Sequence, residues 1–258
     1  MHVPPMCVCG NIFRGKTLAS VSKNLFSVAG KTALITGGGS GIGGFMAQSL
    51  ADEGASILLV GRREEKLKEV LGARDGSIFV IDLSEAGASQ RLFKMVTDRG
   101  YQPDIIVNAA GINPRLHADE IDEDMWNYTV HLNLNVPFLV AQKFVPAMQA
   151  NRWGRIINIA SMQSSRAFPN GISYGAAKGG VTQLTRAMAE AWSALGVTAN
   201  ALAPGFFPTD LTSALFADPK TAADLASRTA MGRTGELGDL RGPLLFLPPD
   251  AGAYIPGP

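Results

Sequence analysis

Three side chains, those of Ser161, Tyr174 and Lys178, have the types and spacing needed to move a proton to or from an oxygen atom. Tyr174 and Lys178 lie four residues apart in the stretch SYGAAKGGV, so on a helix both side chains emerge from one face. A free phenol, with a pKa of about 10, is a poor base near neutral pH, but a neighbouring ammonium group stabilises the phenolate and lowers that pKa. We therefore predict that Tyr174 exchanges a proton with an alcohol or carbonyl oxygen.

Two further features make this proton transfer part of a larger reaction. Ser161 follows the apolar run RIINIA, which we interpret as a strand, and its hydroxyl could hold the same oxygen from the other side. The motifs TGGGSGIG (residues 36–43) and NAAG (residues 108–111) lie upstream. A tyrosine acid–base beside a dinucleotide-binding loop indicates hydride transfer.

The glycine-rich motif predicts a nucleotide site. It follows the apolar run KTALIT and precedes a helix that we expect to begin near Ile42. Gly37, Gly41 and Gly43 let the backbone approach a pyrophosphate, and the helix N-terminus supplies N–H groups and a positive dipole end.

Arginines at the end of the second apolar run favour NADP over NAD. An NAD site usually has an acid there, whereas an arginine accommodates the extra phosphate of NADP, and SILLVG is followed by Arg62 and Arg63. NAD remains possible, because RREEKLKE could instead be a solvated helix start with Glu64 and Lys68 paired.

Six short apolar runs alternate with longer segments, which predicts an α/β fold. The runs are KTALIT, SILLVG, SIFVI, DIIVN, RIINIA and VTANALA, and we expect helices within residues 41–53, 63–72, 85–99, 121–150 and 173–195. Such alternation indicates a single doubly wound Rossmann-type domain, a parallel sheet with helices on both faces. Asp82 and Leu83, just past the third run, are predicted at the adenine; Asp82 could alternatively cap the next helix.

Composition excludes several classes of function. The chain has 258 residues, 46% of them hydrophobic, and a net charge of +1, which gives no electrostatic case for binding nucleic acid or an anionic membrane. No run approaches the roughly 20 apolar residues of a membrane helix. The cysteines, Cys7 and Cys9, form a weak C-x-C pattern, so we predict no metal site and a reducing compartment.

Residues 1–29 differ from the rest of the chain. They contain Arg14, Lys16 and Lys23 and no acid, since the first acidic residue is Asp52. A basic, acid-free leader resembles a transit peptide, which would make the protein mitochondrial. The alternative is a flexible extension ahead of a cytoplasmic domain spanning residues 30–258.

The motifs together resemble the classical short-chain dehydrogenase/reductase family, from about Leu25 to Pro258. TGGGSGIG matches the family's TGxxxGxG, NAAG its NNAG or NAAG, and YGAAK its YxxxK, with Ser161 at the family's serine. NALAPGFFPTDLT matches the segment N-x-x-x-PG-x-x-x-T. The resemblance implies an oxidoreductase acting on a secondary alcohol or ketone.

The resemblance also implies residue roles. The catalytic residues would be Ser161, Tyr174, Lys178 and Asn133, the last helping to hold a water that links the lysine to solvent. Tyr174 and Lys178 would also contact the cofactor, together with Gly37, Ser40, Gly41, Ile42, Gly43, Asn108, Ala109, Gly111, Pro204, Gly205, Phe207 and Thr209.

The segments around Ser161 and Thr209 look most similar to gluconate 5-dehydrogenase-like members, often annotated beside 3-oxoacyl-carrier-protein reductases. A sugar acid would need an arginine for its carboxylate, and Arg115 or Arg166 could serve, although each could equally be an exposed arginine or a subunit contact. Gln163 is a further candidate for the substrate pocket. Acyl thioester reduction is the alternative activity, and a non-catalytic nucleotide-binding homologue the alternative class.

The end of the chain departs from the family pattern. It stops at AYIPGP, so we expect the seventh strand to be missing, the edge at VTANALA to be exposed, and Pro248 to end a helix that starts near Glu236. Residues 205–233 carry little strand signal and are predicted to form a substrate loop over the carboxyl ends of the strands. By resemblance, a homodimer or homotetramer is expected.

Overall fold

The computed structural model describes residues 25–257, in which the six predicted strands form one parallel sheet. The strands are β1 (Thr32–Thr36), β2 (Ser56–Gly61), β3 (Gly76–Val80), β4 (Ile105–Asn108), β5 (Gly154–Ile159) and β6 (Val197–Leu202). Their order is β3-β2-β1-β4-β5-β6, so the winding direction reverses between β1 and β4. Ligands of open parallel sheets bind in the crevice outside the strand ends at such a reversal.

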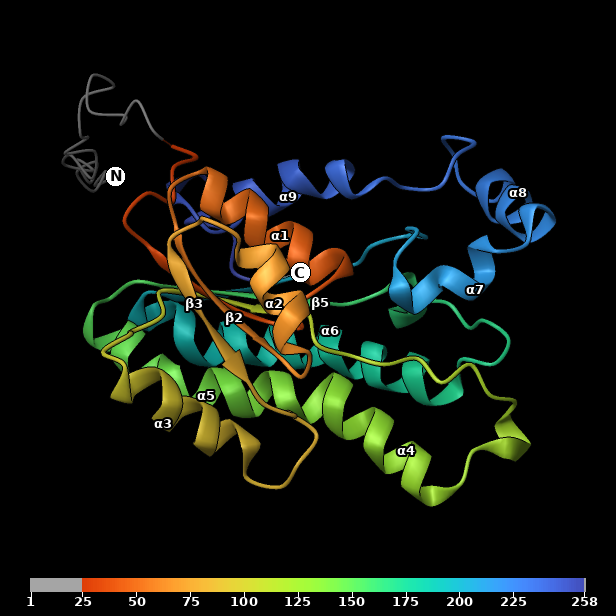
Figure 1. Ribbon diagram of the computed structural model, residues 1–258, viewed down its shortest axis with the longest axis horizontal. Helices are drawn as coiled ribbons and strands as arrows, with labels where there is room; N and C mark the ends of the chain where they lie inside the picture. Colours follow the sequence, from red (N-terminus) through yellow and green to blue (C-terminus); the bar gives the residue numbers. More distant parts are fainter. Residues whose placement is uncertain (1–24, 258) are drawn as a thin grey trace, which may run out of the picture.

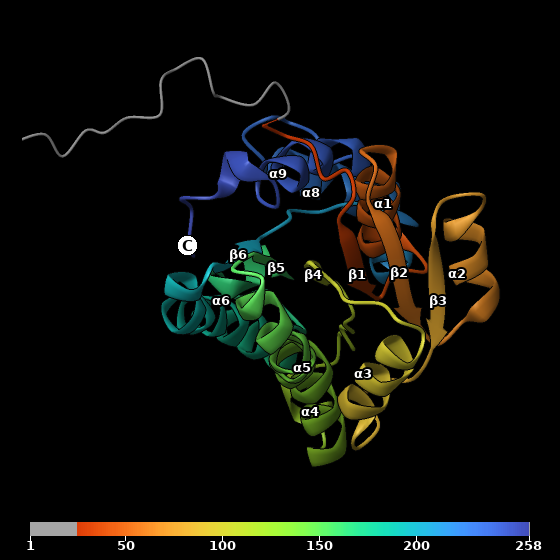
Figure 2. The same ribbon diagram turned by 90° about the vertical axis from the view of Figure 1, so that its left-hand side faces the viewer.

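Helices cover both faces of the sheet, as predicted (Figures 1 and 2). One face carries α1 (Gly41–Asp52), α2 (Glu64–Leu71) and α9 (Arg241–Phe246), and the other carries α3 (Ala88–Asp98), α4 (Glu123–Val130), α5 (Val136–Ala150) and α6 (Ile172–Trp192). Each layer has its own apolar cluster, because side chains of a strand point alternately to the two faces. This pattern explains why the central strands are continuous apolar runs.

The long helix predicted over residues 121–150 is interrupted. Between α4 and α5 the segment His131–Asn135 has π-helical hydrogen bonding. Pro137 explains the break, since it has no N–H to donate to the carbonyl of Asn133, four residues earlier. Single π-helical turns of this kind are frequent at functional sites, and this one contains the predicted catalytic Asn133.

The last residues of the predicted N-terminal extension have contacts with the rest of the domain. Residues 25–29 pack against the domain: Val28 is buried, the Leu25 carbonyl accepts a hydrogen bond from the Ala251 N–H at 3.1 Å, and the Phe26 ring lies 6.4 Å from that of Phe246. The rest of the predicted leader, including both cysteines, lies outside the described residues.

At the other end, no seventh strand is found among residues 25–257, and β6 is the edge of the sheet. The edge is not bare, because the side-chain amide of Asn200 donates to the Ile255 carbonyl at 2.7 Å. Helix α9 ends at Phe246, just before Pro248. The predicted homodimer or homotetramer stays a prediction.

The predicted substrate loop contains more helix than expected. After β6 it forms α7 (Ser213–Phe216) and α8 (Pro219–Ser227), which lie to one side of the sheet (Figure 1). Asp218 explains the start of α8, because its carboxylate accepts hydrogen bonds from the N–H groups of Lys220 and Thr221. No helix in the described part of the chain is long and apolar enough to cross a membrane.

Candidate active site

A cavity of about 510 Å³ lies where the winding of the sheet reverses, and it contains most of the predicted site. Ser161, Tyr174 and Lys178 line it together. The other predicted residues on its wall are Gly37, Ser40, Gly41, Ile42, Gly43, Arg62, Asp82, Leu83, Ala109, Gly111, Arg115, Asn133, Gln163, Pro204, Gly205, Phe207 and Thr209.

The glycine-rich loop is pressed against the end of β4. Gly37 has φ +68°, and a Cβ there would lie 2.8 to 2.9 Å from backbone atoms of Ala109 and Ala110. A Cβ at Gly43 would overlap the Gly37 carbonyl. Both positions therefore need glycine, and the turn they form brings α1 up to the cavity with its N-terminus facing inward.

Ser40 leaves that N-terminus free. It occupies the N-cap position of α1, but its side chain makes no capping hydrogen bond; its hydroxyl instead accepts one from Nη2 of Arg63 at 3.0 Å. The first N–H groups of α1 are thus available to an anion such as a pyrophosphate. This cradle fits a dinucleotide.

Tyr174 and Lys178 lie near the start of α6, and Ser161 follows β5 directly. The Lys178 ammonium is buried, donates to the Ile159 carbonyl at 2.6 Å and lies 5.6 Å from the centre of the Tyr174 ring. The Ser161 hydroxyl accepts from the Gln163 N–H at 3.1 Å, which fixes its direction. The structure thus brings the three groups together as predicted.

The electrostatic balance at Tyr174 differs from the expectation. Burial raises the pKa of the phenol above its usual value, and the side-chain hydrogen bond with Ser161 and the charge of Arg115 offset only part of that rise. Arg115 is therefore a cation that acts on the phenol, and the predicted effect of Lys178 on Tyr174 stays a prediction. Burial also lowers the pKa of Lys178 to about 8; its ammonium donates to a backbone carbonyl and pairs with no carboxylate among the described residues.

Arg115 has an unusual backbone conformation. Its φ of +53° falls in the left-handed region, which a side chain other than glycine adopts at a cost of about 1–2 kcal/mol and mostly at functional sites. The backbone N–H of Arg115 donates a hydrogen bond to the side chain of Asn113 at 3.3 Å. The buried Nε of Arg115 has no hydrogen-bond partner among the described residues, so the guanidinium can still bind an anion in the cavity.

Asn133, in the π-helical segment, is fully buried. Its Nδ2 donates to the carbonyls of Ile112 and Thr129, both at 2.9 Å. Its Oδ1 has no partner among the described residues and lies against Gly111, where an added Cβ would come within 2.5 Å of it and 3.8 Å of the Lys178 Nζ. Its predicted role in a water link to Lys178 stays a prediction.

Two predicted contacts are not at the cavity. Asn108 is a buried residue at the end of β4, and its Nδ2 donates to Asn158 Oδ1 at 2.8 Å and to the Pro137 carbonyl at 3.3 Å. Its side chain thus connects β4 to β5 and α5. Arg166 lines a neighbouring cavity together with His117 and not this one. The structure therefore does not bring these two residues to the cavity wall, and their predicted contacts stay predictions.

At the part of the cavity predicted to hold the adenosine, Arg62 and Asp82 pair at 3.5 Å. Burial raises the pKa of Asp82, but hydrogen bonds from Ser84 and the charge of Arg62 outweigh this, so its pKa is lowered overall. Asp82 does not cap α3, which begins only at Ala88. The alternative interpretation of RREEKLKE also holds in part, since Lys68 and Glu64 pair at 2.9 Å.

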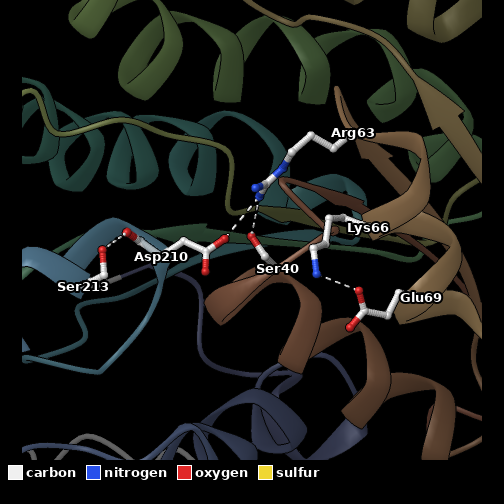
Figure 3. A network of polar contacts seen from close by, with 6 residues as sticks. All are labelled: Ser40, Arg63, Lys66, Glu69, Asp210 and Ser213. Carbon is white, nitrogen blue, oxygen red and sulfur yellow. Dashed lines mark hydrogen bonds and ion pairs between the residues drawn. The ribbon is translucent and has the colours of Figure 1, made fainter.

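Sequence reasoning placed Arg63 beside Arg62 at the end of the second apolar run but gave no site role to Asp210. Nη2 of Arg63 donates to Ser40 and, at 3.2 Å, to Asp210 in the substrate loop (Figure 3). Nothing in the sequence indicated the contact of Asp210 with Arg63. No group of three or more potential metal ligands occurs among His, Cys, Asp and Glu of residues 25–257.

Comparison with known proteins gives consistent matches. The family model described as short chain dehydrogenase matches residues 31–220. A 2-dehydro-3-deoxy-D-gluconate 5-dehydrogenase of Pseudoalteromonas atlantica is 36% identical over 242 residues, covering 90% of this chain and 94% of that protein. A 3-oxoacyl-[acyl-carrier-protein] reductase of Vibrio harveyi is 32% identical over 234 residues, covering 90% and 95%.

Among solved structures, a gluconate 5-dehydrogenase from Burkholderia cenocepacia in complex with NADP and tartrate superposes with a TM-score of 0.86. It is 37% identical and covers 91% of this chain and 94% of its own.

The buried ammonium predicts a distinctive pH dependence of stability. The folded-state pKa of Lys178, about 8, is below the unfolded value of 10.5, so the unfolded chain holds more protons between these values and stability rises with pH. From pH 7.5 to 9.5 we expect this group to add about 2 kcal/mol to the free energy of unfolding, a gain that Lys178→Met should lack. Denaturant unfolding of both proteins at the two pH values measures the difference.

The control is Lys94→Met, which removes an exposed lysine paired with Asp98 and should keep the wild-type pH dependence. Parallel pH curves for the wild type and Lys178→Met would contradict the assignment of a buried charge.

Proposed function

We propose that this chain, which belongs to the short-chain dehydrogenase family, interconverts the alcohol and ketone of a gluconate-like sugar acid with NADP as its preferred cofactor. It is an NAD(P)-dependent dehydrogenase acting on CH–OH groups; the substrate and the cofactor preference are the proposed parts. The observation that supports an acid substrate concerns Arg115, which lines the same cavity as Tyr174 and whose buried Nε has no hydrogen-bond partner among the described residues.

A bound nicotinamide supplies or accepts the hydride, and the chain's own residues handle the oxygen and its proton. In the reductive direction, charge builds on the carbonyl oxygen, to which Ser161 donates a hydrogen bond and Tyr174 donates a proton. Oxidation is the reverse: Tyr174 removes the hydroxyl proton. The raised pKa of Tyr174 keeps the free phenol protonated, the form that reduction requires.

The substrate pocket has one charged end and one apolar wall. Arg115 could bind a carboxylate through two parallel N–H donors, and Gln163 has a buried Oε1 without a partner in the described part of the chain, able to accept from a hydroxyl. On the apolar side the rings of Phe168 and Phe206 meet edge to face at 5.7 Å. The relatives named after gluconates, and the tartrate in one solved structure, support an acid substrate.

Cofactor preference rests on the end of β2. Arg62 and Arg63 follow the strand tip where an NAD-specific site has an acid, and both line the cavity. The relative solved with NADP supports the same choice.

Two alternative functions can be distinguished from the proposed one by an activity assay. The similarity to an acyl-carrier-protein reductase supports thioester reduction as an alternative. A non-catalytic nucleotide-binding homologue is the alternative of another class. Assaying NADPH oxidation with 5-keto-gluconate and with an acetoacetyl thioester separates the three: turnover of the first alone supports the proposal, the second alone favours the reductase, and binding without turnover favours the third.

Tyr174→Phe should lower turnover by about 10²-fold or more, because it removes the proton that a positioned acid–base supplies. The dissociation constant of NADPH should change by less than about threefold, since the phenol oxygen is not needed to hold the phosphates. Steady-state kinetics and fluorescence titration measure the two. Turnover at the wild-type level would show that the proton comes from another group.

Arg115→Gln should raise the KM for 5-keto-gluconate by roughly 10- to 100-fold, the scale of a lost charged hydrogen bond to a carboxylate. Arg166→Gln is the matched control and should leave that KM within about twofold, because Arg166 lies outside the cavity. A ketone without a carboxylate separates the two roles of Arg115: an equal loss there would mean that it acts only through Tyr174.

Arg62→Asp should weaken NADPH binding by at least about tenfold and weaken NADH binding much less, because it replaces a cation at the 2′-phosphate with a like charge. Titration with both nucleotides gives the ratio. An unchanged preference for NADPH would refute the role given to Arg62.

A further inference from the structure

Two residues that line the cavity, Arg63 and Asp210, form an ion pair (Figure 3). Arg63 precedes α2, directly after the tip of β2, and Asp210 lies 147 residues later in the substrate loop. Nη2 of Arg63 donates both to Ser40 in the glycine-rich loop, at 3.0 Å, and to Asp210 Oδ2, at 3.2 Å. One guanidinium nitrogen therefore joins three segments that surround the cofactor cradle.

We propose that Asp210 is a positioning residue for cofactor choice, which competes with the 2′-phosphate of NADP for Arg63. The inference rests on the proposed NADP site at the end of β2. Asp210 holds the guanidinium when the phosphate is absent, as in the free protein or with NAD bound. It therefore weakens the preference for NADP that Arg62 and Arg63 would otherwise produce.

The pair is weak enough to be displaced. The side chains of Arg63 and Asp210 are 61% and 67% exposed, and ion pairs so exposed contribute little to stability. A ribose phosphate carries a charge of about −1.5 to −2 near neutral pH and offers three strong acceptor oxygens, so it outcompetes a single exposed carboxylate. Ser40, on the other side of the same nitrogen, places that phosphate beside the glycine-rich loop.

Hydrogen bonds hold the turn that contains Asp210, so its carboxylate stays near Arg63 after a phosphate has displaced it. Its carbonyl accepts a hydrogen bond from the Ser213 hydroxyl at 3.0 Å, and the N–H of Thr209 donates to Thr212 Oγ1 at 2.9 Å, so the turn is fastened on both sides. Thr209 also packs on Gly41, where an added Cβ would lie 3.4 Å from its own Cβ. The Asp210 carboxylate thus stays near the phosphate as a like charge.

Lys66, in the first turn of α2, is not a competing partner for Asp210. Its ammonium pairs with Glu69 at 2.7 Å, and Lys66 does not line the cavity (Figure 3). Asp210 and the phosphate therefore compete for the guanidinium of Arg63, whereas Arg62 pairs with Asp82.

The test is Asp210→Asn, with dissociation constants of NADPH and NADH measured on the full chain by fluorescence titration at low salt. We expect the NADPH constant to fall by about three- to tenfold, because a competing acceptor and a like charge are both removed, and the NADH constant to change by less than about twofold. Asp224→Asn is the matched control: it removes the same charge from α8, where Asp224 pairs with Arg228 at 2.7 Å outside the cavity, and should leave the NADPH-to-NADH ratio unchanged.

Arg63→Gln supplies the second arm. If Asp210 acts through Arg63, adding Asp210→Asn to Arg63→Gln should change NADPH binding clearly less than it does in the wild type. An undiminished effect of Asp210→Asn in the Arg63→Gln background would overturn the inference. So would weaker NADPH binding in Asp210→Asn alone, or an equal effect of that change on NADPH and NADH. If instead the proposed NADP site were wrong, Arg62→Asp and Arg63→Gln would both leave NADPH binding unchanged.

Discussion

The site depends on a buried cation that has no counter-ion within residues 25–257. Lys178 is enclosed between the end of β5 and the start of α6, and its ammonium is held by the Ile159 carbonyl. Such a charge is costly, which is why its pKa is lowered to about 8, and a chain selected only for stability would have an apolar residue there. A functional reason for this cost is that the same ammonium lies near the Tyr174 ring and Gly111, and that Lys178 lines the cavity.

The fold places this cation by simple geometry. All strands are parallel, so their carboxyl ends meet at one edge, and each βα connection delivers its first residues to that edge. Thr36 strengthens the arrangement, because its hydroxyl accepts hydrogen bonds from the N–H groups of Ala109 and Ala110, at 3.2 Å each. The glycine-rich loop and the NAAG segment are thereby held as one surface.

Local patterns were sufficient for the fold and for most of the cavity. The apolar runs located the six strands, and the motif at Gly37–Gly43 and the spacing of Tyr174 and Lys178 are properties of consecutive residues. The misses are of another kind. The direction of the Asn108 side chain depends on Asn158 in the neighbouring strand, and the contact of Arg63 with Asp210 joins residues 147 positions apart. The influence of Arg115 on Tyr174 likewise depends on burial and on the left-handed backbone conformation of Arg115. No residue type in GINPR predicts that conformation.

The two cations near Tyr174 are not equivalent, and the difference matters for the proposed substrate. The charge of Arg115 lowers the phenol's pKa in the free protein, and Arg115 keeps that charge at any working pH even though burial lowers its own pKa. A substrate carboxylate bound to Arg115 would cancel much of this effect, because an ion pair presents little net charge to its surroundings. Stabilisation of the phenolate then falls to Ser161 and to Lys178, whose charge is the more easily lost. Recognition of an acid and stabilisation of the phenolate therefore compete for one guanidinium, which gives the buried ammonium of Lys178 a reason to remain where it costs stability.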